Sequence, residues 1–110
     1  MILRLWRGWT DPAGTAPYEG LLTGTVAPAI LARGVPGLRD LTVLRRLPGE
    51  HDPSGGAEFL TAMTFDDLAA VSAFTGGDPR GSVVPPAARA LLARFDEHSR
   101  HYEAIASFGG

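Results

Sequence analysis

The sequence predicts a single α+β domain, built on one antiparallel sheet in the ferredoxin-like βαββαβ order. Three observations support this prediction. Apolar residues alternate with other residues in four segments and recur every three or four residues in the segments between them, which are the spacings of strands and of helices. These segments follow one another in the split β-α-β order. The length of 110 residues suits one domain, which we place over residues 1–110.

Residues 1–9 predict the first strand, and both of its sides are largely apolar. Because side chains alternate along a strand, Ile2, Arg4 and Trp6 share one side, and Leu3, Leu5, Arg7 and Trp9 share the other. A strand that is apolar on both sides is normally covered on both, which fits an inner position in the sheet. We expect the helices to cover one side and a second copy of the chain to cover the other.

Residues 15–33 predict the first helix. Thr15 and Pro17 are typical of a helix start, and Gly34 is typical of a helix end. An apolar stripe at helical spacing runs between them. Pro28 removes one helical hydrogen bond and crowds the preceding turn, so we expect a kink there or a break into two short helices.

Residues 38–47 and 57–65 predict the second and third strands, which form a hairpin across the polar loop at 48–56. Asp66 follows the third strand directly and predicts the cap of a second helix. The glycines at positions 76 and 77 would end that helix.

The C-terminal part of the chain predicts a third helical piece and a last strand. Two prolines at 85 and 86 open the helical piece, and an apolar stripe extends it to Phe95. Residues 98–106 predict the strand, in which Ser99 and His101 share one side and Tyr102 lies on the other.

The composition argues against several classes of function. A formal charge of −2 does not favour nucleic acid or an acidic membrane surface as a partner. The absence of cysteine excludes disulfides, thiolate nucleophiles and cysteine-ligated metals, and the absence of lysine excludes Schiff-base chemistry. The sequence shows neither a signal-peptide pattern nor an apolar run of about 18 residues, so we expect a soluble, cytoplasmic protein without membrane contact.

Four short motifs resemble, in their order and spacing, the antibiotic biosynthesis monooxygenase domain family of the dimeric α+β barrel superfamily. They are Trp6-Arg7-Gly8, Val35-Pro36-Gly37-Leu38, Phe65-Asp66-Asp67-Leu68 and His101-Tyr102-Glu103. The resemblance covers essentially the whole chain. It implies a homodimer with a pocket in each subunit between the helices and the sheet. Characterised relatives are cofactor-free oxygenases, which convert aromatic polyketide phenols to quinones, and haem-degrading monooxygenases.

Two departures from the family pattern bear on the activity. Active members commonly carry a tryptophan where the second helix begins, and this chain has Phe65 at the matching position. Haem-degrading relatives use an asparagine on the first strand and a histidine within or after the second helix. This chain has no asparagine, and its histidines are His51, His98 and His101. The resemblance therefore implies chemistry without haem, metal or another cofactor.

Cofactor-free oxygenation needs a base, a group that stabilises an anion, and a dry aromatic pocket. His101 is the candidate base, because imidazole titrates near neutral pH. Arg4 and Arg7 are the candidates for holding the anion. The aromatic residues expected to line the substrate pocket are Trp6, Tyr18, Phe65 and Tyr102.

We therefore predict a homodimeric, cofactor-independent monooxygenase that acts on a small aromatic metabolite. Two alternatives stay open at this point: a non-catalytic dimeric barrel that binds a small hydrophobic molecule, and a cyclase or isomerase that uses the same pocket for proton transfer. We expect no metal site, because His98 and His101 would point to opposite faces of a strand and no carboxylate completes a set of three ligands.

Overall fold

The computed structural model describes residues 1–47, 49–50 and 56–109. His51, which the sequence places in the polar loop, lies outside these residues. The sheet is antiparallel and has the order β2 (Leu38–Arg45), β3 (Ala57–Phe65), β1 (Ile2–Thr10). On its other edge β1 pairs with β4 (Arg94–Phe95) near its end and with β5 (Arg100–Glu103) near its start. β1 is therefore an inner strand. The ferredoxin-like α+β fold predicted from the sequence is confirmed.

The first helical segment is interrupted at the place where the sequence predicts a break. A short 3-10 turn (Pro12–Gly14) leads into α1 (Thr15–Leu21), which continues through a π-helical turn (Leu22–Val26) into α2 (Ala27–Ala32). Pro28 has no N–H to donate, and the wider turn before it is the usual way in which a helix absorbs such a loss. Gly34 follows α2 in the left-handed conformation, with a φ of 62°.

The second helix, α3 (Leu68–Thr75), has its N-cap one residue later than the sequence predicts. Asp67 is the N-cap, because its carboxylate accepts a hydrogen bond of 2.9 Å from the Ala70 N–H. The Asp66 carboxylate instead pairs with Arg39 on β2. Gly76 ends the helix with a φ of 81°, as the sequence predicts.

The C-terminal elements differ from their predicted bounds. α4 spans only Pro86–Leu91, and Arg94–Phe95 forms β4 rather than the end of the helix. The backbone carbonyls of β1 cause this change, since Ala93 N–H donates to Trp9 and Asp96 N–H donates to Arg7. β5 ends at Glu103 rather than at residue 106, because β1 begins at Ile2 and the chain before it offers only the Met1 carbonyl, which accepts from the Ala104 N–H at 3.0 Å.

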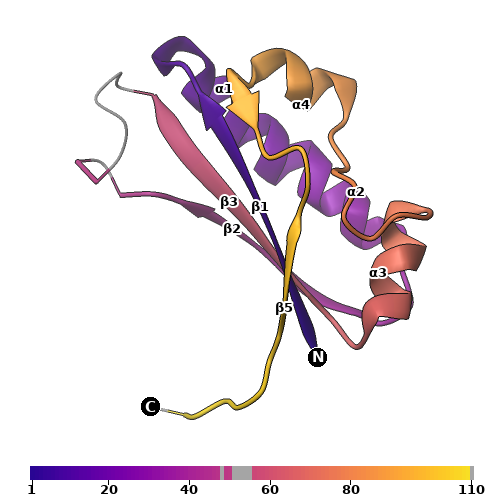
Figure 1. The fold of residues 1–110 in the computed structure, drawn as a ribbon. Coiled ribbons are helices and arrows are strands. Elements are labelled where there is room, and N and C mark those ends of the chain that lie inside the picture. The colour runs from indigo at the N-terminus through magenta and orange to yellow at the C-terminus, as the bar shows by residue number, and fades with distance from the viewer. Residues whose placement is uncertain (48, 51–55, 110) are drawn as a thin grey trace.

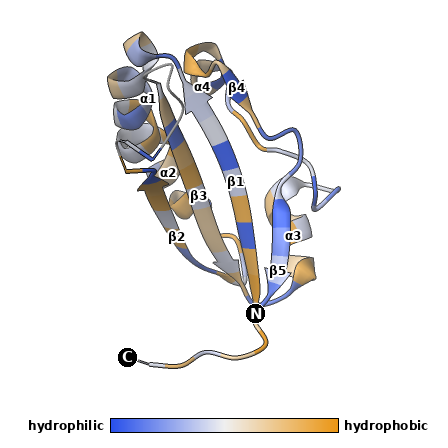
Figure 2. Cartoon of the chain, turned by 60° about the vertical axis from the view of Figure 1, so that its left-hand side comes forward, coloured by the Kyte–Doolittle hydropathy of each residue, from blue (hydrophilic) through white to orange (hydrophobic). Residues whose placement is uncertain are grey.

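All helices lie on one side of the sheet (Figure 1). The core between the two layers has two clusters, one around Phe65, Val71 and Phe74 and the other around Tyr18 and Phe59. The opposite side of the sheet, here called the open face, is not covered by any described residue. Its side chains are half-buried or exposed, with 43% exposure for Leu44 and 50% for Tyr102. Alternating polar and apolar bands along β1 are visible in Figure 2.

None of the helices in the described part of the chain combines the length and the hydrophobicity that a transmembrane span requires.

Candidate functional site

A pocket lies between the helices and the sheet, in the layer that holds the core. Its wall is mainly apolar, and polar side chains enter it from the two inner strands and from the start of β5. Its apolar lining includes Leu22, Val26, Ile30, Leu41, Met63 and Phe74. The cavity volume is about 50 Å³, enough for a few water molecules. Typical ligand pockets are several times larger, so an aromatic ligand requires the walls to move apart.

Arg4 brings a positive charge to this pocket from the helix-facing side of β1. Its side chain is only 3% exposed. One terminal nitrogen, Nη1, donates to the Pro79 carbonyl at 2.5 Å, and the other, Nη2, donates to the Gly81 carbonyl at 2.7 Å. The guanidinium also lies 5.4 Å from the ring centre of Phe74. Among the described residues no carboxylate pairs with it.

Burial lowers the pKa of Arg4 to about 10, which still leaves the guanidinium protonated at neutral pH. The pocket therefore contains a buried cation whose charge is balanced by no carboxylate of the described chain. Such a charge is costly unless hydrogen bonds or a counter-ion compensate it.

His101 lies opposite Arg4 in the register of β1 and β5. Its Nε2 is 3.0 Å from Arg4 Nη1. Because a guanidinium can only donate, Nε2 accepts this bond and the ring proton is on Nδ1. Burial, followed by the positive charge of Arg4, lowers the pKa of His101. His101 is therefore neutral, and its lone pair is already engaged.

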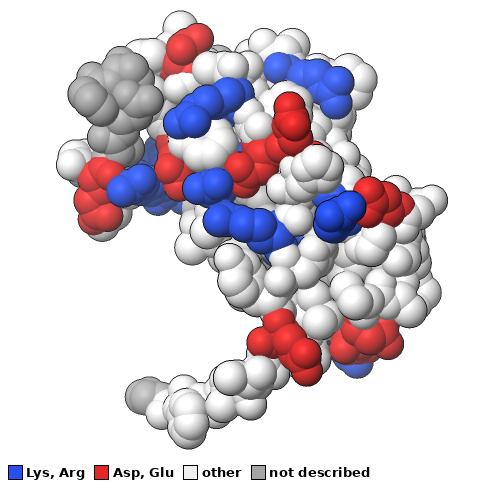
Figure 3. Space-filling view, viewed as in Figure 1, with Lys and Arg blue, Asp and Glu red and all other residues white. Residues whose placement is uncertain are grey.

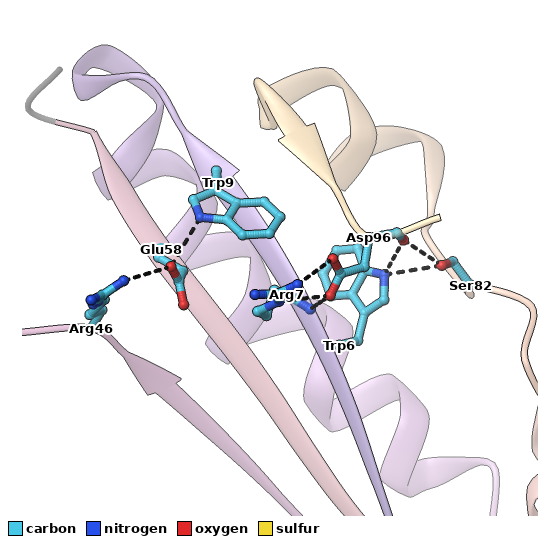
Figure 4. A network of polar contacts seen from close by, with 7 residues as sticks. All are labelled: Trp6, Arg7, Trp9, Arg46, Glu58, Ser82 and Asp96. Carbon is cyan, nitrogen blue, oxygen red and sulfur yellow. Dashed lines mark hydrogen bonds and ion pairs between the residues drawn. The ribbon is translucent and has the colours of Figure 1, made fainter. Parts of the chain in front are cut away.

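Trp6 lines the pocket on the same side of β1 as Arg4, and hydrogen bonds from its indole N–H fix the ring in place. The indole N–H donates to the Asp96 carbonyl at 2.9 Å and to Ser82 Oγ at 3.1 Å, as Figure 4 shows. The Ser82 hydroxyl donates in turn to the Asp96 carbonyl at 2.6 Å. Two segments far apart in the sequence thus fix the orientation of this aromatic wall.

Tyr18 and Phe65, two further predicted lining residues, differ in their positions. Tyr18 lines the pocket and packs edge-on against Phe59, with ring centres 5.0 Å apart. Burial raises the pKa of its hydroxyl to about 12, so the hydroxyl remains a hydrogen-bond donor at neutral pH. Phe65 is fully buried in the core against Phe74 and does not reach the pocket.

Arg7 and Tyr102 lie on the open face, away from the pocket. Arg7 forms a two-bond ion pair with the Asp96 carboxylate, at 3.0 and 3.2 Å, and its guanidinium lies 5.0 Å from the Trp9 ring centre. Tyr102 is paired with Leu3 and is half exposed. The structure therefore brings Arg4, His101, Trp6 and Tyr18 together and separates Arg7, Tyr102 and Phe65 from them.

A polar cluster surrounds Trp9 on the open face. The Trp9 indole N–H donates to Glu58 at 3.1 Å, Arg46 pairs with the same carboxylate at 3.4 Å, and Arg94 lies 4.0 Å from the Trp9 ring centre. Figure 3 shows basic and acidic side chains interleaved on the face turned to the viewer, and Figure 4 shows how Arg7, Glu58 and Trp9 are arranged. Because Arg7 and Arg46 are already paired with carboxylates and Arg94 lies over the Trp9 ring, this cluster is a poor candidate for an anion site.

Ser99 is a pocket residue that the sequence does not single out. It is 4% exposed, lines the pocket, and its Oγ has no hydrogen-bond partner among the described residues. The alternation of the last strand places it on the same side as His101. That alternation is the only sequence signal for its position, because an isolated serine has no distinguishing pattern.

No protein-family model matches the sequence, and no curated protein matches it. Solved structures do match the fold. A variant of MhuD, crystallised with two manganese protoporphyrin IX molecules bound per active site, gives a TM-score of 0.64 at 18% identity, over 100% of both chains. A Bacillus cereus protein assigned by name to the antibiotic biosynthesis monooxygenases gives a TM-score of 0.57 at 13% identity, over 100% of this chain and 96% of the other. The chain therefore has the fold of the antibiotic biosynthesis monooxygenase domain, as its sequence motifs predict.

Proposed function

We propose that this chain is a cofactor-independent monooxygenase, which binds a small aromatic molecule as an anion in the pocket beside Arg4. The observation that carries the proposal is the buried Arg4 guanidinium on the wall of an apolar pocket, without a carboxylate partner among the described residues. A cation in such a place stabilises a phenolate much better than it could in water. The shared fold with a protein assigned to the monooxygenases supports the choice of reaction.

The proposed chemistry needs a phenolate and molecular oxygen. The phenol loses its proton, the electron-rich ring reduces oxygen, and a C–O bond forms to give a ring peroxide, which takes back the proton and becomes a hydroperoxide. Loss of water then leaves a quinone, so that one oxygen atom stays on the ring and the other leaves as water. Arg4 favours the first step, because its charge lowers the pKa of a phenol placed next to it. His101 can accept the proton only after Arg4 has turned from Nε2 to the ligand.

A second candidate function is non-catalytic binding of a small hydrophobic anion. It is favoured by the engaged lone pair of His101, and by the absence of any carboxylate or imidazole from the described residues that line the pocket. A cyclase or isomerase would need a free base at the same place, so this observation also argues against that alternative.

We further propose that a second copy of the chain covers the open face. The apolar side chains at its centre come from three neighbouring strands. They are Leu3, Leu5, Leu44, Leu60 and Ala62. Burying such a surface against an identical one is the simplest way for a short chain to protect it from water.

Oxygen uptake with a polycyclic phenol tests the proposed reaction. We expect uptake by the wild-type protein, a decrease of about 100-fold or more in Arg4→Met, and a smaller decrease in His101→Ala. Arg45→Met is the control, because Arg45 lies at the end of β2 and pairs with Glu19 on the protein surface. Binding of the phenol without any uptake by the wild-type protein would exclude the monooxygenase and favour the binding protein.

A further inference from the structure

The hydrogen-bond donors of Arg4 are only partly used. A guanidinium has five N–H groups. The two on Nη1 donate to Pro79 and His101, and one on Nη2 donates to Gly81. The Nε–H and the second Nη2–H have no acceptor among the described residues. Arg4 lines the pocket, so a ligand bound there can reach the side chain that carries the two unused N–H groups.

Ser99 lies close to this guanidinium and is also unpaired. Its backbone N–H donates to the Arg80 carbonyl at 3.0 Å, and Arg4 Nη2 donates to the next carbonyl along the chain, that of Gly81. Both residues are therefore held by neighbouring carbonyls of the same short segment. Ser99 Oγ is buried on the pocket wall without a partner, although a buried hydroxyl normally has one.

We propose that Arg4 and Ser99 form a carboxylate-binding site, and that the ligand of this pocket is a small aromatic carboxylic acid. A carboxylate is planar and has two oxygens, which match two N–H groups on one edge of a guanidinium. Its single negative charge balances the one buried cation, and Ser99 Oγ can donate to either oxygen. The apolar wall formed by Trp6, Met63 and Phe74 would then receive the ring.

Other anions fit this corner less well. A phenolate has one oxygen and would leave a donor of the guanidinium unpaired. A phosphate carries more charge than the site balances, and its additional oxygens would face apolar side chains. The inference rests on the pocket of the proposed function and refines which anionic group contacts Arg4: a substrate that carries a carboxylate places that group, rather than its phenolate oxygen, on the guanidinium. It does not rest on the reaction, because a carboxylate can be held here whether or not the ring is oxidised.

Benzoate and benzamide are suitable probes, because they have nearly the same shape and differ in charge. We would titrate each into the ¹⁵N-labelled protein at pH 7 and follow the indole N–H of Trp6 and the amide of Ser99. We expect benzoate to bind at least about tenfold more tightly than benzamide. Equal affinities, or no binding of benzoate in the millimolar range, would overturn the proposal.

Two substitutions locate the site. Arg4→Lys keeps the charge but loses the two-donor edge, so we expect about tenfold weaker benzoate binding and unchanged benzamide binding. Ser99→Ala should weaken benzoate several-fold, and it removes an unpaired buried hydroxyl, so it should fold even if Arg4→Lys does not. Arg45→Lys on β2 and Ser72→Ala on α3 are the matched controls, because neither residue lines the pocket. Benzoate binding that survives both Arg4→Lys and Ser99→Ala would place the anion elsewhere.

The outcome is separable from that of the oxygen-uptake assay. Selective benzoate binding without oxygen uptake would retain the carboxylate site and reject the monooxygenase. Oxidation of a phenol by a protein that does not discriminate between benzoate and benzamide would reject the carboxylate site alone.

Discussion

The Arg4 guanidinium replaces its hydration shell by two backbone carbonyls, an imidazole nitrogen and the face of Phe74. These contacts compensate part of a desolvation cost that is on the order of several kcal/mol for a buried charge. They also hold residues 79–81 against β1, next to Val83 and Val84 on the pocket wall. An anion bound to Arg4 would therefore contact the same side chain that holds one wall of the pocket in place.

The burial of His101, together with its contact with Arg4, makes the stability of the protein depend on pH. Because the folded state lowers the pKa of His101, the unfolded chain takes up the proton first, below pH of about 6.5. The free energy of unfolding should therefore fall as the pH decreases through this range. The loss is complete once the folded protein is protonated as well.

His101→Gln tests this dependence, because the amide oxygen can still accept from Arg4 but does not titrate. We expect the difference in unfolding free energy between pH 7.5 and pH 5.5, measured with urea, to be smaller in the variant than in the wild-type protein. Equal differences in the two proteins would show that folding does not lower the pKa of His101.

Strand alternation predicts part of the site at this scale. It groups Arg4 with Trp6 on one strand and Ser99 with His101 on another, and these groups meet in the structure. It does not tell which face of a two-sided strand receives the helices, since both faces of β1 are apolar. Arg7 therefore stands beside Arg4 as an equal candidate in the sequence, although it lies on the opposite face of the sheet.

At the scale of elements, the two adjacent carboxylates at the N-terminus of α3 differ in how much they contribute to stability. Asp67 caps the helix, and Asp66 forms an exposed ion pair with Arg39. Asp67→Ala should lower the unfolding free energy by about 1 kcal/mol. Asp66→Ala should lower it by less than about 0.5 kcal/mol, because exposed ion pairs contribute little. Urea unfolding of both variants measures the two effects. A larger loss of unfolding free energy for Asp66→Ala would show that Asp67 is not the residue that caps α3.

The elements that the sequence predicts least well are those fixed by distant partners. The apolar stripe of residues 87–95 is compatible with a helix, yet Phe95 is placed in a strand by hydrogen bonds to β1 from the residues around it. Trp6 then packs beside Phe95, with ring centres 6.0 Å apart. Asp96 completes the support of Trp6, and no local pattern marks it, because its role depends on this pairing.

At the scale of the whole molecule, the open face presents apolar side chains from three neighbouring strands that no described residue covers. We predict that the protein is a dimer at micromolar concentration by sedimentation velocity. Leu5→Glu should shift it toward the monomer, because it places a charge at the centre of the open face. Leu68→Glu is the control, since Leu68 is 53% exposed on α3, in the helical layer. A compact wild-type monomer would contradict the proposed pairing.

The central claim is that the buried, partly unpaired Arg4 receives the anionic group of an aromatic ligand. A crystal structure of the protein with bound benzoate tests it most directly. The account predicts the two carboxylate oxygens on Nε and Nη2 of Arg4, one of them also accepting from Ser99 Oγ, and the ring against Trp6. Benzoate bound outside the pocket, or in the pocket with its carboxylate turned away from Arg4, would contradict it.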